Sequence, residues 1–460
     1  MAQAISVVSR NTKMAEIAFS KVSGPVPWEI DKRRTLRALV CFCLALASCA
    51  LLENTFTLYA VDLAESLGGS GGRISVSFTL LVLTYAVTGP FFSKLYDAYG
   101  ASNVMFLSLV FLVVGYAVLG FTSSLLMLYT GHVIVGIGVG CLWAPCVAGA
   151  IKLVPPDKHA IVSSLATISF MMGSLLLSYP IAQIMEMHGF KVAYIVQGTI
   201  SVIVIGLSAA AMPNFKRDIM RTAATPSGRT PHGHGNRHDD SSSSDDSDEE
   251  DDSGVPLVTS IVLYVAYVIT ATMYYFFEAM QLPILESTLP EDCPVLKVAV
   301  PFCISCNVLG RLFWGLVAAK RKATLCMLAA FGLTMLSVNV WGVMASSPGW
   351  SLICVGLCFF TSGSMYPLMP VAILRIYGED RAVFMCALFM TADALAAVFG
   401  APCAAILAAH VGWPRVLNLS SVPLVVLFAA LLFTSCAEQV ATPQTDSTAD
   451  LVESREDALE

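Results

Sequence analysis

Residues 89–100 read GPFFSKLYDAYG, and residues 310–322 read GRLFWGLVAAKRK. Each segment closes an apolar run long enough to cross a membrane, about 20 residues, and each has a glycine ahead of charged residues. The second segment is a degraded copy of the first at the corresponding place in the other part of the chain. A motif that recurs in this way indicates an internal repeat, so we expect two related halves.

Twelve apolar runs of membrane-spanning length can be read outward from these two segments. They are Leu36–Ala60, Ile74–Ser93, Val104–Phe121, Leu125–Val147, Ala160–Met185, Val192–Met212, Val255–Leu282, Val295–Val317, Thr324–Met344, Trp350–Ile376, Ala382–Ala409 and Pro414–Cys436. Six runs stand on each side of a long polar segment. The sequence therefore predicts an all-α membrane protein with twelve transmembrane helices in two pseudo-symmetric six-helix bundles.

The composition excludes a soluble enzyme. Of the 460 residues, 56% are hydrophobic and 13% are charged, and the mean hydropathy is +0.72; a soluble globular chain carries about 25% charged residues. The 14 cysteines lie mostly inside apolar runs, where a thiol packs as a small hydrophobe. We see no nucleophile–base pair, metal-ligand cluster or nucleotide-binding motif in the apolar body. We therefore expect no catalytic residue, cofactor, metal or nucleic-acid partner.

The polar segments divide the chain. We expect a cytoplasmic N-terminal segment (1–35), a first bundle (36–212), a disordered acidic linker (213–254), a second bundle (255–436) and an acidic tail (437–460). The linker contains His232, His234 and His238, for which we favour a flexible tether over a metal-binding tract.

The distribution of basic residues predicts the orientation. With a cytoplasmic N-terminus, the loops on the opposite side hold only Arg73, Lys191, Lys297 and Arg415. Both termini, the linker and the tail are then cytoplasmic, and we expect the plasma membrane rather than an organelle.

Six plus six helices with a repeated motif resemble the major facilitator superfamily of transporters, whose halves rock about a site near the midplane. In that family's loop signature, small residues let helices approach and an Asp at a cytoplasmic helix end holds the closed state. The resemblance implies a gating role for Gly89, Asp97, Gly100, Gly310, Gly315, Lys320 and Arg321. The basic residues that usually follow the Asp are replaced here, which leaves the partner of Asp97 open.

Three stretches of sequence indicate which family within the superfamily the chain resembles. Phe78–Tyr99, Tyr129–Pro145 (YTGHVIVGIGVGCLWAP) and Gly189–Tyr194 (GFKVAY) are similar to the oxalate/formate antiporter family and the related monocarboxylate porters. The resemblance implies a monomeric secondary transporter in the bilayer, acting as symporter or antiporter on a small carboxylate.

An ionisable side chain inside hydrocarbon costs at least about 2.5–3.5 kcal/mol, so each one must be solvated, paired or functional. Arg311 occupies a position that, in the resembling family, binds the substrate carboxylate; the alternative is an arginine near the cytoplasmic end that snorkels to the interface or ties helices together. Asp393 stands where the oxalate antiporter carries a lysine, which disfavours recognition of a dicarboxylate by two cations. Asp393 is expected to pair with Arg311, to carry a proton or to meet an amino group. Further expected substrate contacts are Asn54, Tyr274, Tyr275 and Asn307.

The coupling proton has four candidate carriers: His132, Glu53, Asp393 and Glu278. His132 stands where the superfamily often places an arginine and titrates near neutral pH, although a neutral, hydrogen-bonded histidine fits equally. Glu53 is either a cavity carboxylate or a packing partner. Glu278 follows two tyrosines near a helix end, where such residues commonly form the wet boundary.

Three functions follow from these residues. The first is a secondary transporter of monocarboxylates driven by protons or by exchange. The second keeps the fold but transports amino acids or organic cations, because acids outnumber the one intramembrane arginine. The third is a transporter-shaped sensor that signals through its acidic linker without net flux.

Overall fold

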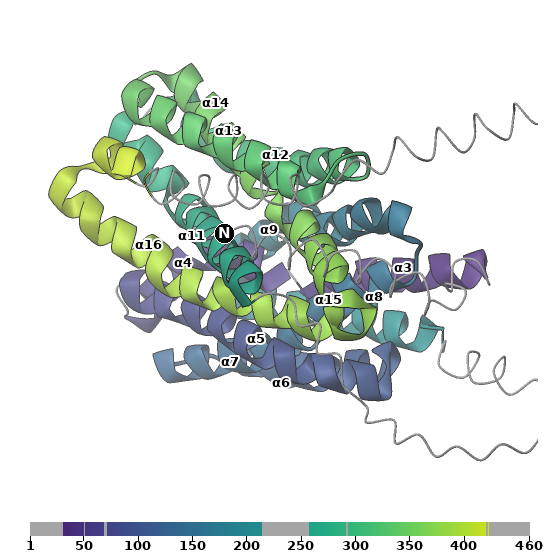
Figure 1. The fold of residues 1–460 in the computed structure, drawn as a ribbon. Coiled ribbons are helices and arrows are strands. Elements are labelled where there is room, and N and C mark those ends of the chain that lie inside the picture. Colours follow the sequence, from purple (N-terminus) through teal and green to yellow (C-terminus); the bar gives the residue numbers. More distant parts are fainter. Residues whose placement is uncertain are drawn as a thin grey trace, which may run out of the picture.

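A computed structural model gives the positions of residues 31–49, 51–68, 71–213, 257–290, 293–419 and 422. These residues form helices and no strand, as Figure 1 shows. Most of the N-terminal segment, the linker, the tail and the twelfth predicted run lie outside the described residues. The predicted all-α class is confirmed.

The first half contains the helices α3 (Lys32–Cys49), α4 (Leu51–Leu67), α5 (Gly71–Tyr99), α6 (Ala101–Gly120), α7 (Leu125–Gly140), α8 (Trp143–Lys152) and α9 (His159–Ala211), with a short 3-10 helix, η1 (Pro156–Lys158). Two predicted runs are joined in α9, which folds back at Gly189. The φ of 78° at this residue lies in the left-handed region, which glycine adopts without a steric cost.

The second half contains α11 (Leu257–Thr288), α12 (Pro294–Ala318), α13 (Ala323–Met344), α14 (Pro348–Ser362), α15 (Met365–Phe389) and α16 (Thr391–Val411). The chain turns again at Gly412, with a φ of 80°, and then continues as a helix over 413–419. Gly412 corresponds in its half to Gly189, because each joins the fifth span of a half to the sixth. The repeat thus extends to the turns.

Two spans are broken at matching places. In the first half, α7 ends and α8 begins around Cys141 and Leu142; in the second, α14 ends and α15 begins around Gly363 and Ser364. Each break precedes a proline, Pro145 or Pro367, whose ring clashes with the carbonyl four residues earlier in a continuous helix. Gly/Pro-interrupted helices at corresponding positions of two halves are the strongest pointer to a transporter's binding site.

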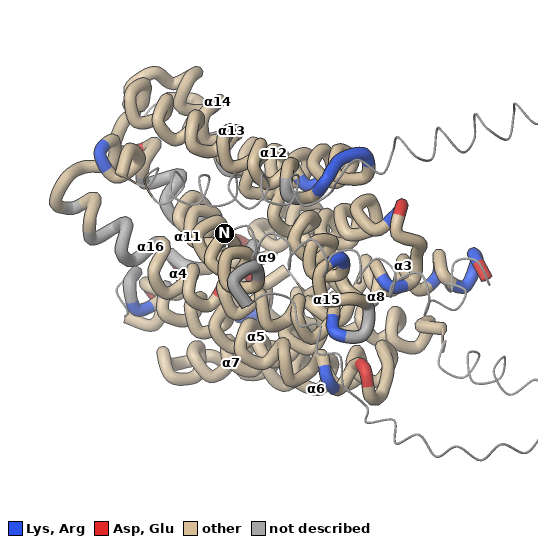
Figure 2. The backbone as a smooth tube through the Cα atoms, viewed as in Figure 1, with Lys and Arg blue, Asp and Glu red and all other residues tan. Residues whose placement is uncertain are grey.

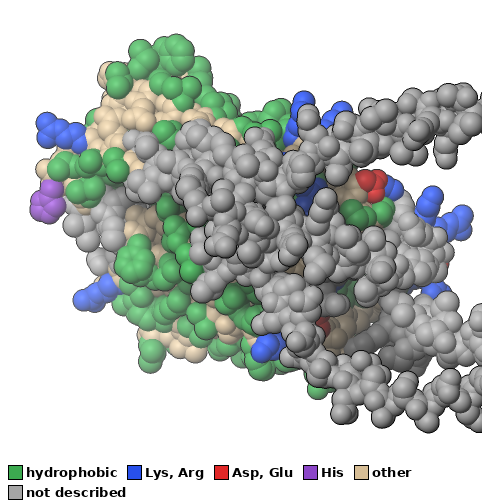
Figure 3. Space-filling view, in the orientation of Figure 1, with side chains coloured by type: hydrophobic (Ala, Val, Ile, Leu, Met, Phe, Trp, Pro, Cys, Tyr) green, Lys and Arg blue, Asp and Glu red, His purple; other side chains and the backbone are tan. Residues whose placement is uncertain are grey.

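Ten helical stretches of the described residues are long and apolar enough to cross a membrane, and one of them, Pro156–Ala211, holds two predicted runs. Many of their outward-facing side chains are large and apolar; Leu126, Val87, Phe399 and Val343 are examples, and Figure 3 shows such side chains over the visible surface. Most of the described Lys and Arg residues lie toward the end of the bundle where α3 begins and α12 ends, as the coloured backbone in Figure 2 shows. The protein is an integral, multi-pass membrane protein.

The two halves meet along several helix pairs. Helix α5 packs against α15 and α16, α8 against α15, and α9 against α12 and α15. The broken helices α8 and α15 are therefore in mutual contact, and the buried charged residues gather near them.

Candidate functional site

Arg311 is a charged residue buried at the contact between the halves. It extends from α12, and only 1% of its surface is exposed. Its Nε donates to Oδ1 of Asn307 at 2.9 Å, and its Nη1 donates to the backbone carbonyl of Thr167 in α9 at 2.7 Å. Since Thr167 belongs to the first half, both halves hold this guanidinium. Arg311 therefore does not snorkel to the interface, whereas the alternative in which it ties helices together agrees with its bond to Thr167.

Aromatic rings enclose the arginine. The guanidinium carbon of Arg311 lies over the ring of Tyr366 in α15, 4.2 Å from its centroid, which is a cation–π contact. Tyr274 meets Tyr366 and Tyr275 edge-on, with centroid separations of 5.4 and 5.3 Å. Trp143 of α8 reaches Tyr366 from the first half at 6.5 Å. Arg311 is thus buried against an aromatic cluster, where electrostatic interactions are stronger than in water.

The predicted candidate Asn307 positions this guanidinium. Its Nδ2 donates to the backbone carbonyl of Phe359 at 3.1 Å, which fixes the amide so that Oδ1 faces Arg311. The break after Ser362 brings Phe359 within reach, because α14 ends there. Asn307 thus acts through Arg311 in this conformation.

Glu53 lies beside a tyrosine from each half. Its Oε1 is 3.4 Å from the hydroxyl of Tyr85 in α5 and 3.3 Å from the hydroxyl of Tyr275 in α11. The two hydroxyls are 2.8 Å apart. A hydroxyl has one proton, so when one tyrosine donates to the other, only the other can donate to Glu53. Oε2 of Glu53 has no hydrogen-bond partner among the described residues.

Asp393 is fully buried at the start of α16. Its Oδ2 accepts from the hydroxyl of Tyr267 at 3.4 Å, and its Oδ1 is unpartnered within the described part of the chain. No ion pair joins Asp393 to Arg311, both of which the structure describes. The predicted alternative of an Arg311–Asp393 ion pair is therefore wrong for this conformation. Arg311, Glu53 and Asp393 nevertheless lie within electrostatic range of one another.

His132 lies elsewhere, inside the first half. Its Nδ1 is 2.9 Å from the backbone carbonyl of Leu128, and a carbonyl only accepts, so Nδ1 carries the proton. The ring meets Phe56 and Tyr194 edge-on. Its Nε2 has no partner among the described residues. The structure thus does not bring His132 into contact with the residues around Arg311.

Two expected site residues cannot be placed. The side chains of Asn54 and Glu278 lie outside the described residues, although both positions fall within helices, α4 and α11. Their predicted roles stay predictions.

The repeated motif lies where the halves touch. Asp97 forms an ion pair with Lys152 at the end of α8, with 3.9 Å between Nζ and Oδ1, which answers how Asp97 is paired. Lys94 lies over the ring of Phe384 in α15, 5.1 Å from its centroid. A Cβ on Gly315 would collide with the hydroxyl of Ser164 in α9. Two more motif glycines lie against other helices: Gly89 faces Ala387, and Gly310 faces the backbone of Phe360. Gly100 adopts a φ of 84°. The two basic motif residues, Lys320 and Arg321, are exposed.

Sequence reasoning missed four residues of the site: Thr167, Tyr85, Tyr267 and Tyr366. Thr167 contributes only its backbone carbonyl, which no residue pattern announces. The tyrosines lie in apolar runs and read as packing. One signal in the sequence could have pointed to Tyr366. It directly precedes Pro367, and Trp143 and Ala144 precede Pro145 at the corresponding place in the first half. Helices interrupted by proline at corresponding positions of two halves indicate a binding site.

Comparisons with known proteins show which proteins this chain resembles. Residues 40–290 match a family model described as Major Facilitator Superfamily. The Oxalate:formate antiporter of Oxalobacter formigenes is 24% identical over 394 residues, which cover 83% of this chain and 87% of that protein. An uncharacterised MFS-type transporter of Escherichia coli (strain K12), YhjX, is 24% identical over 170 residues, which cover 37% of this chain and 42% of that protein.

Solved structures show the same fold. FucP in its outward conformation matches with a TM-score of 0.65 at 12% identity, covering 86% of this chain and 98% of FucP. The human organic anion transporter MFSD10 (TETRAN) matches with a TM-score of 0.66 at 14% identity, covering 86% of this chain and 99% of that protein. At these identities the likeness extends to the fold alone.

Proposed function

The chain belongs to the Major Facilitator Superfamily, and from this we propose that it transports small organic anions, chiefly monocarboxylates, by alternating access. The relatives reported above are transporters, among them an antiporter, so the chain is a membrane transporter and not an enzyme. The substrate class rests on the site residues described above and on the similarity to an oxalate:formate antiporter.

The observation that carries the proposal is the state of Arg311. A buried guanidinium is permanently charged and strongly destabilising unless an anion neutralises it. Among the described residues, it bonds only to neutral oxygens, those of Asn307 and Thr167. Glu53 and Asp393 lie within electrostatic range but do not pair with it. A substrate carboxylate would supply the missing contact, and the planar guanidinium suits it.

A site with a single arginine suits a substrate with a single carboxylate group. A dicarboxylate needs a second cation, and Asp393 places a carboxyl group where that cation would stand. We therefore favour monocarboxylates over oxalate-like substrates.

Coupling to protons is proposed through Glu53 and Asp393. Each is buried, each has one oxygen without a hydrogen-bond partner among the described residues, and each touches a tyrosine hydroxyl. A carboxyl group in this setting can exchange a proton when the site opens to water. His132 remains a third candidate, but the described contacts tie it to its own helix and to rings of the first half.

A second substrate class has its own support. Two buried carboxyl groups lie within range of one arginine, an arrangement that could bind the amino and carboxylate groups of an amino acid together. We propose this as the alternative substrate.

We further propose that both termini face the cytoplasm and that the protein works as a monomer in the plasma membrane. The gathering of basic residues at one end of the bundle supports this orientation (Figure 2).

Ligand-dependent thermal unfolding tests the substrate class. The purified protein is heated with panels of monocarboxylates, dicarboxylates, amino acids and organic cations, because a ligand that binds the folded state raises the Tm. We expect a monocarboxylate to stabilise the wild type and to leave Arg311→Ala unchanged. Stabilisation of the wild type only by amino acids would favour the alternative, and a monocarboxylate effect that survives Arg311→Ala would refute the assigned site.

A further inference from the structure

A groove of about 460 Å³ runs along the outer face of α3, between this helix and the end of α9. Its walls are apolar and exposed: Leu36, Val40 and Leu44 follow one stripe of α3, and Leu207 faces them from α9. Arg33 and Arg37 line the end at which α3 begins. The groove lies outside the substrate site, and none of its residues contacts Arg311, Glu53 or Asp393 in the contacts described above.

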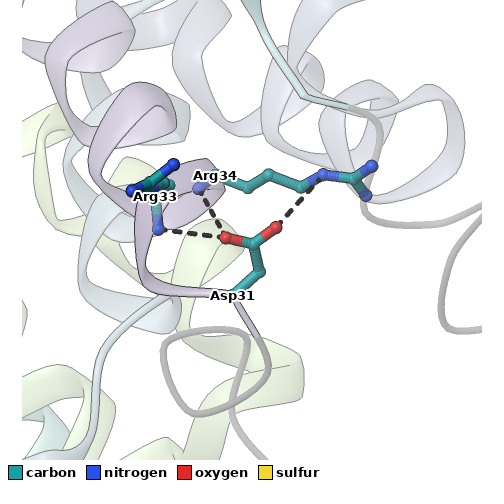
Figure 4. A network of polar contacts seen from close by, with 3 residues as sticks. All are labelled: Asp31, Arg33 and Arg34. Atoms are coloured by element: carbon teal, nitrogen blue, oxygen red, sulfur yellow. Dashed lines mark hydrogen bonds and ion pairs between the residues drawn. The ribbon is translucent and has the colours of Figure 1, made fainter.

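Arg33 and Arg37 differ from the neighbouring Arg34 in their side-chain contacts with the described residues. The side chain of Arg34 is held by Asp31, whose Oδ2 pairs with Nε of Arg34 at 3.3 Å, as Figure 4 shows. Oδ1 of Asp31 accepts from the backbone N–H groups of Arg33 and Arg34, both at 3.0 Å. The side chain of Arg33 points away from this carboxylate. Among the described residues, no hydrogen bond or ion pair engages the side chain of Arg33 or Arg37.

The groove has the length of one membrane leaflet. Arg33 and Leu44 are eleven residues apart on a helix, about 16 Å at 1.5 Å per residue. Half of a hydrocarbon core of about 30 Å is about 15 Å. Two cations at one end and an apolar channel of leaflet depth match a charged head group and an acyl chain.

We propose that this groove binds an anionic glycerophospholipid, with the phosphate between Arg33 and Arg37 and an acyl chain along Leu36, Val40 and Leu44. The cytoplasmic leaflet carries the anionic lipids, and basic residues at a cytoplasmic helix end attract them. Only the choice of leaflet rests on the proposed orientation; neither the transport activity nor the substrate enters the argument.

Native mass spectrometry of the purified full-length protein tests this site, with dioleoyl phosphatidylglycerol as the probe and dioleoyl phosphatidylcholine as the neutral comparison. The Arg33→Ala/Arg37→Ala protein should bind phosphatidylglycerol about 30-fold more weakly, since each arginine near an anionic head group contributes about 1 kcal/mol and 1.4 kcal/mol is tenfold. A matched control, Lys32→Ala/Arg34→Ala, removes the same charge from the same turn outside the groove and should keep the wild-type affinity.

A second variant tests the apolar part without touching a charge. Leu207→Trp fills the channel from an exposed position, so the fold should tolerate it, and it should also weaken phosphatidylglycerol binding. Three results would overturn the proposal: equal losses in both charge variants, no preference over phosphatidylcholine, or competition by glycerol 3-phosphate as strong as that by the lipid. The last result would indicate a site for a soluble anion. Thermal unfolding without lipid identifies any variant that fails to fold.

Discussion

The hydroxyls of Tyr85 and Tyr275 meet at 2.8 Å, each contributed by a different half of the molecule, and Oε1 of Glu53 lies within 3.4 Å of both. The contact between the halves at this point therefore passes beside a carboxyl group that can gain or lose a proton. If Glu53 carries the coupling proton, as proposed, such a junction would link its protonation to the relative position of the halves.

Removal of either hydroxyl should weaken this junction. We expect Tyr85→Phe or Tyr275→Phe to shift the equilibrium away from the present conformation by about fivefold, because a hydrogen bond contributes about 1 kcal/mol. Distances between spin labels on the two halves report the shift. Tyr129→Phe is the matched control, since that hydroxyl bonds to the carbonyl of Arg73 within the first half. Equal shifts in all three variants would contradict the role of the junction.

Asn307→Asp should place a carboxylate beside Arg311 that neutralises its charge in place of a substrate. The new carboxylate would replace the amide that now accepts from Nε of Arg311 at 2.9 Å, and a protein-borne anion would then neutralise the guanidinium. We expect the affinity for a carboxylate substrate to fall at least tenfold, as measured by titration. Asn339→Asp places the same change on α13, where the amide donates to the carbonyl of Met335, and should leave the affinity unchanged. Tight binding by the Asn307→Asp protein would mean that Arg311 does not contact the substrate.

Transport driven by a pH gradient should show which of the two buried acids, Glu53 or Asp393, carries the coupling proton. Glu53→Gln and Asp393→Asn keep the shape of each side chain but carry no proton that can titrate. In proteoliposomes with an acidic exterior, the variant of the proton-carrying residue should lose gradient-driven accumulation. It should retain the exchange of internal for external substrate. A His132→Gln protein should still accumulate substrate, because no described contact links His132 to the site. Loss of accumulation only in His132→Gln would move the coupling role to the histidine.

The motif glycines should differ sharply in their tolerance of a methyl group. A Cβ on Gly310 would collide with the backbone carbonyl of Phe360, which cannot move away as a flexible side chain can. Gly310→Ala should therefore destabilise the protein by about 1–3 kcal/mol, the usual cost of overpacking. At Gly89 the added atom would lie 3.6 Å from Cβ of Ala387, an ordinary contact, so Gly89→Ala should be tolerated. Thermal unfolding in detergent compares the two, and equal stabilities would contradict the close packing at Gly310.

Much of the fold could be predicted because a bilayer imposes a simple rule on length and polarity. Apolar runs such as Val104–Phe121 correspond closely to a helix, here α6, and the motif at 89–100 ends where α5 ends. The ends of helices escaped prediction, since α5 continues to Tyr99, six residues beyond the apolar run that was predicted to end at Ser93. Hydropathy detects the hydrocarbon core, while hydrogen bonding carries the helix into the interface.

The site was predictable where it carries charge. Arg311 and Asp393 stand out in apolar runs, because a charge there has a cost that demands an explanation. Their partners could not be predicted in the same way. Tyr85 and Tyr275 lie 190 residues apart in sequence, and only the packing of the two halves shows that their hydroxyls touch. Ion pairing likewise depends on distances that a sequence does not contain, which is why the sequence leaves an Arg311–Asp393 pair open as one of three alternatives and only the structure shows that it is not formed in this conformation.

The bond from Arg311 to the carbonyl of Thr167 has a consequence for biogenesis. The two halves repeat one architecture, yet an N–H group of the arginine encoded in the second donates to a backbone carbonyl of the first. A second unit made alone would hold a cation in its interior that lacks this acceptor, at a cost that leaves it poorly folded. Gene duplication can produce such units, but they are no longer interchangeable modules: each completes the other only when both are inserted in the same membrane and have docked.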